Sequence, residues 1–162
     1  GEVGAETTLT QVALKQRPRQ FKTPAIAQQT DIAFGSPALL KLIGYRRPTG
    51  VLSPGQTLPV TLYWRAEAEM EVNYTVFVQL LNSDWRVVAQ RDLQPQAGAA
   101  PTTTWLPGEI LTDPYTLSLS GDLPPGDYRL IAGMYDPATG QRLPVSGPAS
   151  GDFVDLGMVT IR

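Results

Sequence analysis

Apolar and polar residues alternate along much of the chain from residue 31 onward, and a period of two is typical of a β-strand with one buried face. The clearest stretch is 57–65, where Leu58, Leu62 and Trp64 fall on one face of the predicted strand. Residues 73–81 are almost continuously β-favouring, as expected of a central strand covered on both faces. Further strands are predicted at 38–46, 85–91, 109–111, 115–120, 128–134, 141–145 and 153–161.

Clusters of turn-forming residues separate these stretches, and the chain contains 15 Gly and 15 Pro. Short strands with turns between them, and no helical stretch of any length, predict an all-β, antiparallel β-sandwich. Leu-Pro-Pro-Gly-Asp-Tyr at 123–128 is typical of a tyrosine corner and favours an immunoglobulin-like arrangement, with a jelly roll as the alternative. The apolar positions of the last strand change parity at Gly157, which predicts a β-bulge there.

The chain divides into two parts by composition. Residues 1–30 have weak periodicity and are predicted to form a linker or N-terminal arm, and residues 31–162 form the sandwich domain. The arm contains the basic segment 15–22, with Lys15, Arg17, Arg19 and Lys22. We expect this segment to be a solvated connector rather than a patch that binds anionic lipid. The start Gly-Glu-Val is typical of a domain excised from a longer protein.

Composition excludes several kinds of function. A net charge of −2 gives no basic field for nucleic acid, and no segment has the roughly 18 apolar residues that span a bilayer. The chain has no Cys and no His, which excludes Ser-His-Asp and Cys-His catalysis and thiolate or imidazole metal ligands. A calcium site from Asp136, Asp152 and Asp155 is conceivable, but the spacing of a calcium-binding loop is absent. We therefore predict no catalytic residue, metal or cofactor.

Two tryptophans are candidates for ligand contact. Trp105 lies in Pro-Thr-Thr-Thr-Trp-Leu-Pro-Gly-Glu-Ile-Leu (101–111), between two predicted strands. It could stack on a sugar, with Glu109 accepting a hydroxyl hydrogen bond, but packing beneath the connection is the favoured interpretation. Trp85 stands at a hairpin tip, where glycine is the ordinary residue. It either folds back onto a neighbouring strand or is offered to a partner, and both alternatives stay open.

The last predicted hairpin adds polar candidates. Asp136 is expected to cap its own turn and Gly140 to adopt positive φ. Arg142 is expected to pair with Asp136 or Asp92 across the sheet edge. The residues predicted to contact a ligand are Trp105, Trp85, Asp92, Tyr135 and Arg142.

A family resemblance covers residues 38–162. It is carried by the segments PGQTLPVTLYWRA, YTVFVQLLNSDWRVVAQRDLQP, PTTTWLPGEIL, DPYTLSL and LPPGDYRLIAGMYDPATGQRLPV. This series resembles the soluble β-sandwich domain found carboxy-terminal to the membrane helices of some bacterial glycosyltransferases of the protein-mannosyltransferase-like group, which use lipid-phosphate-linked sugars. The matching positions are Trp64, Phe77, Asp92, Pro95, Trp105, Gly108, Tyr128, Tyr135, Asp136, Gly140, Arg142 and Leu143. Trp85 departs from the family's usual glycine.

The resemblance implies an accessory, extracytoplasmic domain without transferase activity of its own, because catalysis in that family is expected in the membrane portion. Its expected partners are an acceptor glycan or protein, with a tether to the membrane through upstream helices and no nucleic acid. The alternative function is a carbohydrate-binding module of a secreted or surface protein. A carboxylate-based hydrolase is a third class, and no pair of acids stands out in the sequence to support it.

Overall fold

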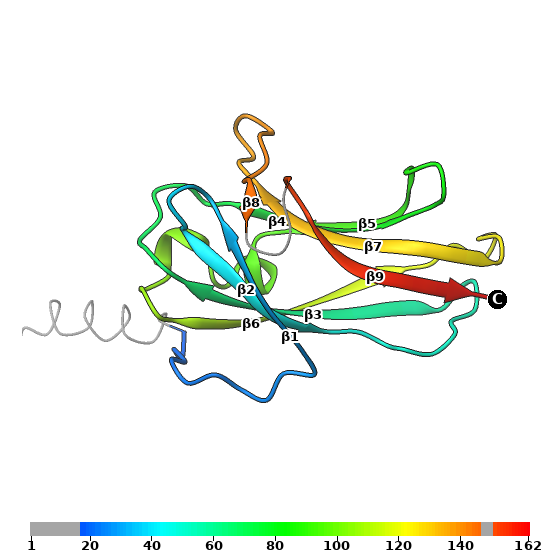
Figure 1. Ribbon diagram of the computed structural model, residues 1–162, viewed down its shortest axis with the longest axis horizontal. Helices are drawn as coiled ribbons and strands as arrows, with labels where there is room; N and C mark the ends of the chain where they lie inside the picture. The colour runs from blue at the N-terminus through cyan, green and yellow to red at the C-terminus, as the bar shows by residue number, and fades with distance from the viewer. Residues whose placement is uncertain (1–16, 147–150) are drawn as a thin grey trace, which may run out of the picture.

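The computed structural model describes residues 17–146 and 151–162, and these residues form two antiparallel sheets that face each other (Figure 1). The first, here called the β3 sheet, has the order β6 (Ile110–Ser118), β3 (Thr57–Ala66), β2 (Leu40–Arg46), β1 (Gln28–Phe34) and β8 (Val145–Ser146). The second, the β4 sheet, has the order β5 (Val87–Leu93), β4 (Thr75–Leu81), β7 (Gly126–Tyr135) and β9 (Val154–Ile161). Two short 3-10 turns, η1 (Pro95–Gly98) and η2 (Thr102–Thr104), lie between β5 and β6. The predicted all-β sandwich is confirmed.

The connections between the sheets follow an immunoglobulin-like pattern. Hairpins join β2 to β3 and β4 to β5, after which β6 returns to pair with β3 and β7 crosses to pair with β4. The Tyr128 hydroxyl donates a hydrogen bond to the carbonyl of Pro124 at 2.6 Å, which is the predicted tyrosine corner. The immunoglobulin-like arrangement is therefore observed, and the jelly roll is not.

The core between the sheets comes from the alternation seen in the sequence. Leu58, Leu62 and Trp64 of β3 are fully buried, as are the inward residues of β4 and β7. Phe34 meets the edge of the Trp64 ring at a centroid distance of 5.3 Å. Arg129 of β7 aligns with Met158 and Ile131 with Asp155, so β9 has one extra residue here, and Gly157 adopts φ 95°. The predicted bulge at Gly157 is confirmed, and it lets β9 keep its apolar residues inward on both sides of the glycine.

Three strand predictions need correction. Strand β1 was missed, because its first half is polar and only Ile32 and Phe34 alternate clearly as buried residues. The segments 109–111 and 115–120 belong to one strand, β6, which contains Pro114. Proline has no N–H to donate, but β6 is an edge strand, and on its outer side no ladder hydrogen bond is lost. The expected strand at 141–145 is mostly loop, with an isolated bridge between Arg142 and Tyr135 before the two-residue β8.

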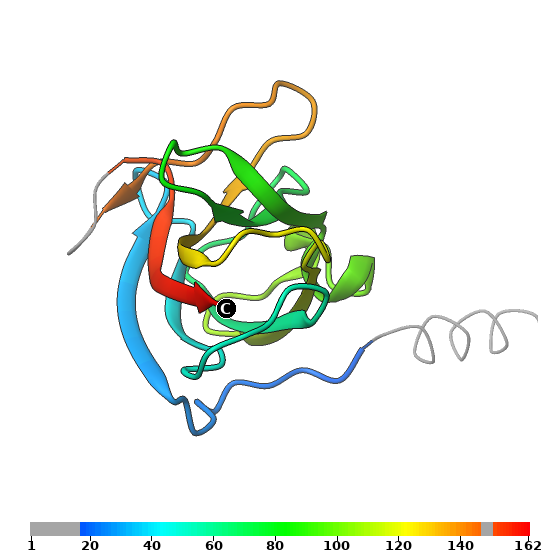
Figure 2. The same cartoon turned by 90° about the vertical axis from the view of Figure 1, so that its right-hand side faces the viewer.

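The described part of the N-terminal arm, residues 17–27, runs along the outer side of the β3 sheet (Figures 1 and 2). Ile26 of the arm packs against Ile43, Tyr63 and Ile110. A Cβ at Gly44 would lie 2.3 Å from Cγ2 of Ile26, so the glycine permits this close approach. The outer face of the β3 sheet is therefore partly covered by the chain itself. Within residues 17–146 and 151–162, no helix is long and apolar enough to cross a membrane.

Candidate functional site

Trp105 is a packing residue in this structure. Its side chain is 1% exposed, and its indole N–H donates a hydrogen bond to the carbonyl of Ala100 at 2.8 Å. The ring fills the core beneath the connection from β5 to β6, and no face of it is free to stack on a sugar. The favoured packing interpretation is confirmed, and the prediction that Trp105 contacts a ligand is wrong.

Glu109 of the same segment is fully buried and paired with the arm. Arg19 Nη1 donates to its Oε1 at 2.6 Å, and Arg17 Nη2 lies 3.1 Å from its Oε2. The amide of Leu106 donates to Oε1 at 3.0 Å. Burial is the largest influence on the pKa of Arg17 and lowers it. Arg17 and Arg19 are thus fixed to the sandwich, which corrects the expectation of a solvated connector; Lys15 lies outside the described residues.

Asp113 is a second fully buried carboxylate, and the sequence analysis did not single it out. Its Oδ2 accepts hydrogen bonds from Trp64 Nε1 at 3.0 Å and the Tyr115 hydroxyl at 2.8 Å. Its Oδ1 accepts from the amide of Gln96 at 2.7 Å. Burial raises the pKa of Asp113 to about 6, although the three hydrogen bonds oppose that rise. The alternation of the sequence could have identified Asp113 as buried, because it occupies the same inward-facing series of positions in β6 as Leu111 and Tyr115.

Three of the predicted contact residues come together on the outer face of the β4 sheet. Asp92, Tyr135 and Arg142 line one shallow pocket of about 200 Å³, here called the Tyr135 pocket. The other lining residues are Phe77, Gln79 and Gly140. The Tyr135 hydroxyl donates to Asp92 Oδ2 at 2.9 Å. Burial, and then the Asp92 carboxylate, raise the pKa of Tyr135, so the phenol stays protonated and keeps this hydrogen bond at neutral pH.

The floor of the Tyr135 pocket is Phe77, and the guanidinium of Arg142 lies over its ring. The guanidinium carbon of Arg142 is 4.2 Å from the centre of the Phe77 ring, a cation–π distance. Arg142 Nη1 also lies 3.4 Å from Asp152 Oδ1, so its acidic partner is Asp152 and neither of the two acids expected from the sequence. A Cβ at Gly133 would lie 2.4 Å from the Phe77 ring, so the glycine makes room for this floor.

Trp85 both folds back and remains exposed. Its side chain is 58% exposed, yet its ring lies 5.4 Å from the guanidinium carbon of Arg129 and 6.3 Å from the ring of Phe153. Its φ of 62° is the left-handed conformation that glycine adopts without strain. Asp127 and Met158 help to line a pocket of about 220 Å³ beside it, here called the Trp85 pocket. Trp85 therefore folds back onto neighbouring side chains, as the first alternative expects, and contact of its exposed ring with a partner stays a prediction.

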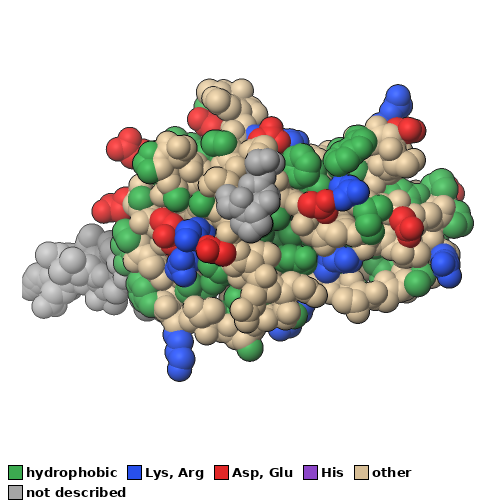
Figure 3. Space-filling view, in the orientation of Figure 1, with side chains coloured by type: hydrophobic (Ala, Val, Ile, Leu, Met, Phe, Trp, Pro, Cys, Tyr) green, Lys and Arg blue, Asp and Glu red, His purple; other side chains and the backbone are tan. Residues whose placement is uncertain are grey.

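Apolar side chains connect these two pockets across the sheet. Phe77, Leu81 and Ile131 are buried on its outer face, with Tyr135 and Phe153 packed against them. Figure 3 shows hydrophobic side chains on the side where β7 and β9 lie, with basic and acidic side chains interspersed. The sequence analysis did not predict this apolar face, nor the part that Arg129 and Phe153 have in it. Residues from separate strands come together only when the strands pair into a sheet.

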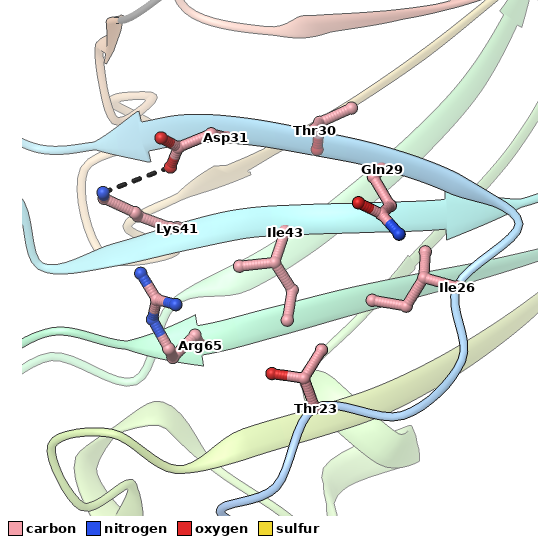
Figure 4. Close-up of a pocket in the computed structure, with 8 residues that line it drawn as sticks. All are labelled: Thr23, Ile26, Gln29, Thr30, Asp31, Lys41, Ile43 and Arg65. Carbon is pink, nitrogen blue, oxygen red and sulfur yellow. Dashed lines mark ion pairs between the residues drawn. The ribbon is translucent and has the colours of Figure 1, made fainter.

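A different pocket, of about 290 Å³, lies between the arm and the β3 sheet (Figure 4). Thr23 and Ile26 come from the arm, and Ile43 comes from the facing sheet. Both cations at this pocket have acidic partners: Lys41 lies 3.1 Å from Asp31, and Arg65 lies 2.8 Å from Glu67. This arrangement binds the arm to the sheet and leaves little unneutralised charge for a ligand.

The loop after β7 follows the predicted turn chemistry. Asp136 Oδ1 accepts from the amide of Ala138 at 2.9 Å, and Gly140 has φ 76°. Asp136, Asp152 and Asp155 do not gather: over residues 17–146 and 151–162, no group of three acidic side chains could hold a metal ion.

Comparison with known proteins shows little beyond the fold. No protein-family model matches the chain, and no curated protein matches it. The similar solved structures include the C-terminal domain of wzt, the CARDB domain of the PF1109 protein from Pyrococcus furiosus in complex with di-metal ions, and AvmM, described as catalysing macrocyclization in alchivemycin A biosynthesis.

These similarities are distant. The wzt domain is 13% identical over 85% of this chain and 82% of its own, with a TM-score of 0.49. The CARDB domain is 10% identical over 91% and 100%, with a TM-score of 0.43, and AvmM is 12% identical over 86% and 96%, with a TM-score of 0.37. At such identities and scores they carry no inference about function.

Proposed function

We propose that this β-sandwich is a non-catalytic accessory domain that contacts glycan, carried by a membrane-tethered bacterial glycosyltransferase. The observation that carries the proposal is the Tyr135 pocket. Asp92 meets Tyr135 and Arg142, which follow it by more than 40 residues, over the ring of Phe77, and all four are positions of the family resemblance. The fold alone does not argue for a ligand, since β-sandwiches serve many functions.

The chemistry of the Tyr135 pocket suits a sugar. Asp92 accepts hydrogen bonds, Arg142 donates them, and Gln79 does both, which matches hydroxyl groups that both donate and accept. The apolar part of the pocket surface comes from Tyr135, a partly exposed ring that packs against the buried Phe77. With about 200 Å³ of space, the pocket is smaller than the roughly 300–1,000 Å³ that enclosed small-molecule sites occupy. A ligand held here is one that lies on the surface, such as part of a glycan.

The placement of the acids supports a binding role over hydrolysis. A glycosidase needs two carboxyl groups about 5–9.5 Å apart across the scissile bond. Among the described residues, Asp92 is the carboxylate that lines the Tyr135 pocket, and Asp152 is paired with Arg142. Glu109 and Asp113, which are fully buried, are engaged by arginines and by core hydrogen bonds.

Binding measurements test the proposal directly. Titration calorimetry with neutral manno- and gluco-oligosaccharides should detect binding to the wild-type domain. Arg142→Ala and Asp92→Asn should each raise Kd about tenfold or more, because each removes a charge-assisted hydrogen bond worth roughly 1.5–3 kcal/mol. Arg46→Ala, an exposed arginine on the other sheet, is the matched control and should leave Kd unchanged. Absence of binding across both series would refute the proposal.

The association with a membrane glycosyltransferase has a separate test. Determining the coding region that surrounds this segment should reveal several apolar, membrane-spanning segments upstream. An upstream region that encodes a secreted enzyme without such segments would favour the alternative, a carbohydrate-binding module.

A further inference from the structure

Two groups of the same composition lie on the outer face of the β4 sheet. In one, Arg142 lies over the ring of Phe77 and pairs with Asp152. In the other, Arg129 lies over the ring of Trp85 and pairs with Asp155. Each group thus combines an aromatic ring, a guanidinium and a carboxylate.

The strand register sets the spacing of the two groups. Leu81 of β4 pairs with Arg129, and Phe77 pairs with Gly133. The two positions are four residues apart along the same strands, which corresponds to about 13 Å at a rise of about 3.3 Å per residue. That spacing is too long for one monosaccharide to touch both groups and suits a chain of several units.

The surface between the two groups is continuous. Phe153 contacts Trp85 and also belongs to the apolar cluster of Phe77, Leu81 and Ile131. Beside this cluster, Gln79 Nε2 donates to Gln90 Oε1 at 3.5 Å, a long bond that leaves both amides with free capacity. A chain that spanned both groups would therefore meet apolar surface and neutral hydrogen-bonding groups along its path.

We propose that these two groups form one linear site for a neutral oligosaccharide chain, with the Tyr135 pocket at one end and Trp85 at the other. This inference rests on the glycan-contact function proposed above and specifies its ligand class. The charge balance selects a neutral chain: each arginine already has an aspartate partner, and Asp92 adds a further negative charge. An anionic polymer would gain no net positive field here.

The backbone at Trp85 gives independent support. A bulky residue at positive φ costs free energy, and such strain is concentrated at binding and catalytic sites. Glycine would adopt this turn without that cost, whereas the tryptophan places an exposed aromatic face at the end of the sheet. An exposed indole supplies the stacking surface that the buried Phe77 ring does not supply.

The experiment measures how affinity depends on chain length. Kd is determined for neutral manno- and gluco-oligosaccharides of one to six units, with wild type, Trp85→Ala and a Phe21→Ala control. Phe21 is an equally exposed aromatic residue on the arm. In wild type, Kd should fall about tenfold or more between dimer and hexamer, because only the longer chain reaches Trp85. In Trp85→Ala this gain should disappear while dimer binding stays, and Phe21→Ala should behave as wild type.

The outcomes separate the two proposals. Binding that depends on Arg142 but on neither chain length nor Trp85 would overturn the linear site and leave the glycan-contact function in place. Absence of binding to every oligosaccharide would overturn both. Tighter binding of polyuronate oligomers than of neutral ones of equal length would overturn the assignment of a neutral chain. Circular dichroism of each variant confirms that it is folded, so that lost affinity reflects the site.

Discussion

Trp105 and Trp85 occupy connections between strands, yet the structure uses them in opposite ways. Trp105 is 1% exposed, with its indole N–H hydrogen-bonded to Ala100. Trp85 is 58% exposed on a left-handed residue, with an arginine over its ring. Both follow short polar segments in the sequence, so composition does not distinguish them. The difference lies in what surrounds each connection: the first crosses between sheets over the core, and the second closes a hairpin at its edge.

The surroundings of each tryptophan determine whether its ring is buried and stabilises the fold or remains exposed and accessible to a ligand. The Trp105 connection is held by core packing and by Glu109, which two arginines of the arm engage. The Trp85 hairpin has no comparable cover among the described residues, and its ring lies against Arg129 of β7 and Phe153, which precedes β9. Four sets of measurements test whether the two connections differ in this way.

Truncating the two tryptophans should give the largest difference. Trp105→Ala should lower the free energy of unfolding by about 3–5 kcal/mol, because it leaves a cavity in the core and removes a hydrogen bond. Trp85→Ala should change it by about 1 kcal/mol or less, because the side chain is mostly exposed. Urea unfolding followed by circular dichroism measures both. Equal losses in the two variants would show that the contrast in burial does not govern stability.

The acid beneath the Trp105 connection should make stability depend on pH. The pKa of Asp113 is raised to about 6 in the folded state, so the folded protein holds a proton that the unfolded chain releases near pH 4. The contribution of Asp113 therefore falls as pH rises from about 4 to 6, by about 3 kcal/mol at most, and is constant above that range.

Asp113→Asn is the control for this titration. The variant should be less stable throughout, because an amide has one acceptor oxygen where three donors converge. Urea unfolding at pH 4, 5, 6 and 7 gives the difference between the variant and wild type, which should shrink as pH rises. A difference that is constant over this range would argue against a raised pKa.

Removing the charge of Glu109 should loosen the arm. Glu109→Gln leaves the two arginines without a carboxylate, and we expect a loss of about 2 kcal/mol, less than for a fully enclosed pair because the arginines can reach water. Trypsin should then cut after Arg19 and Lys22 faster than in wild type. Glu67→Gln, which disrupts a partly exposed pair with Arg65, is the control. Unchanged cleavage at Arg19 would mean that the arm is held by its other contacts, such as the Ile110 amide hydrogen bond to the Gln20 carbonyl and the packing of Ile26.

The smallest expected effect concerns the backbone of Trp85. Trp85→Gly should be more stable than Trp85→Ala by about 1 kcal/mol, because alanine pays for the left-handed conformation and glycine does not. Both variants lack the ring, so the difference reports on the backbone alone, and both should lose the gain of affinity with chain length. Thermal unfolding in one buffer resolves it. A more stable alanine variant would show that the hairpin changes conformation when the ring is removed.

Local pattern predicted much of the fold. The alternation of Leu58, Leu62 and Trp64 identified β3 and its inward face, and Leu-Pro-Pro-Gly-Asp-Tyr located the tyrosine corner. A change of parity located the bulge at Gly157. Strand β1 was not predicted, because its amino-terminal half is polar and its position depends on pairing with β2, which no local pattern encodes. Because of Pro114, strand β6 was predicted as two separate strands. An edge strand tolerates proline, but the local sequence does not show which strand lies at the edge of the sheet.

The local sequence was enough to predict the period of most strands, the turns between them, the absence of Cys and His, and a hairpin tip at Trp85 where glycine is the ordinary residue. These properties depend on neighbours along the chain. The three-dimensional fold was needed to show that Trp105 is buried, that Arg17 and Arg19 reach Glu109, and that Asp92, Tyr135 and Arg142 share a pocket. The hydrogen bonds from Arg17 and Arg19 to Glu109 and from Tyr135 to Asp92 join residues 43 to 92 positions apart, and pairing between strands and packing between sheets bring such distant residues together.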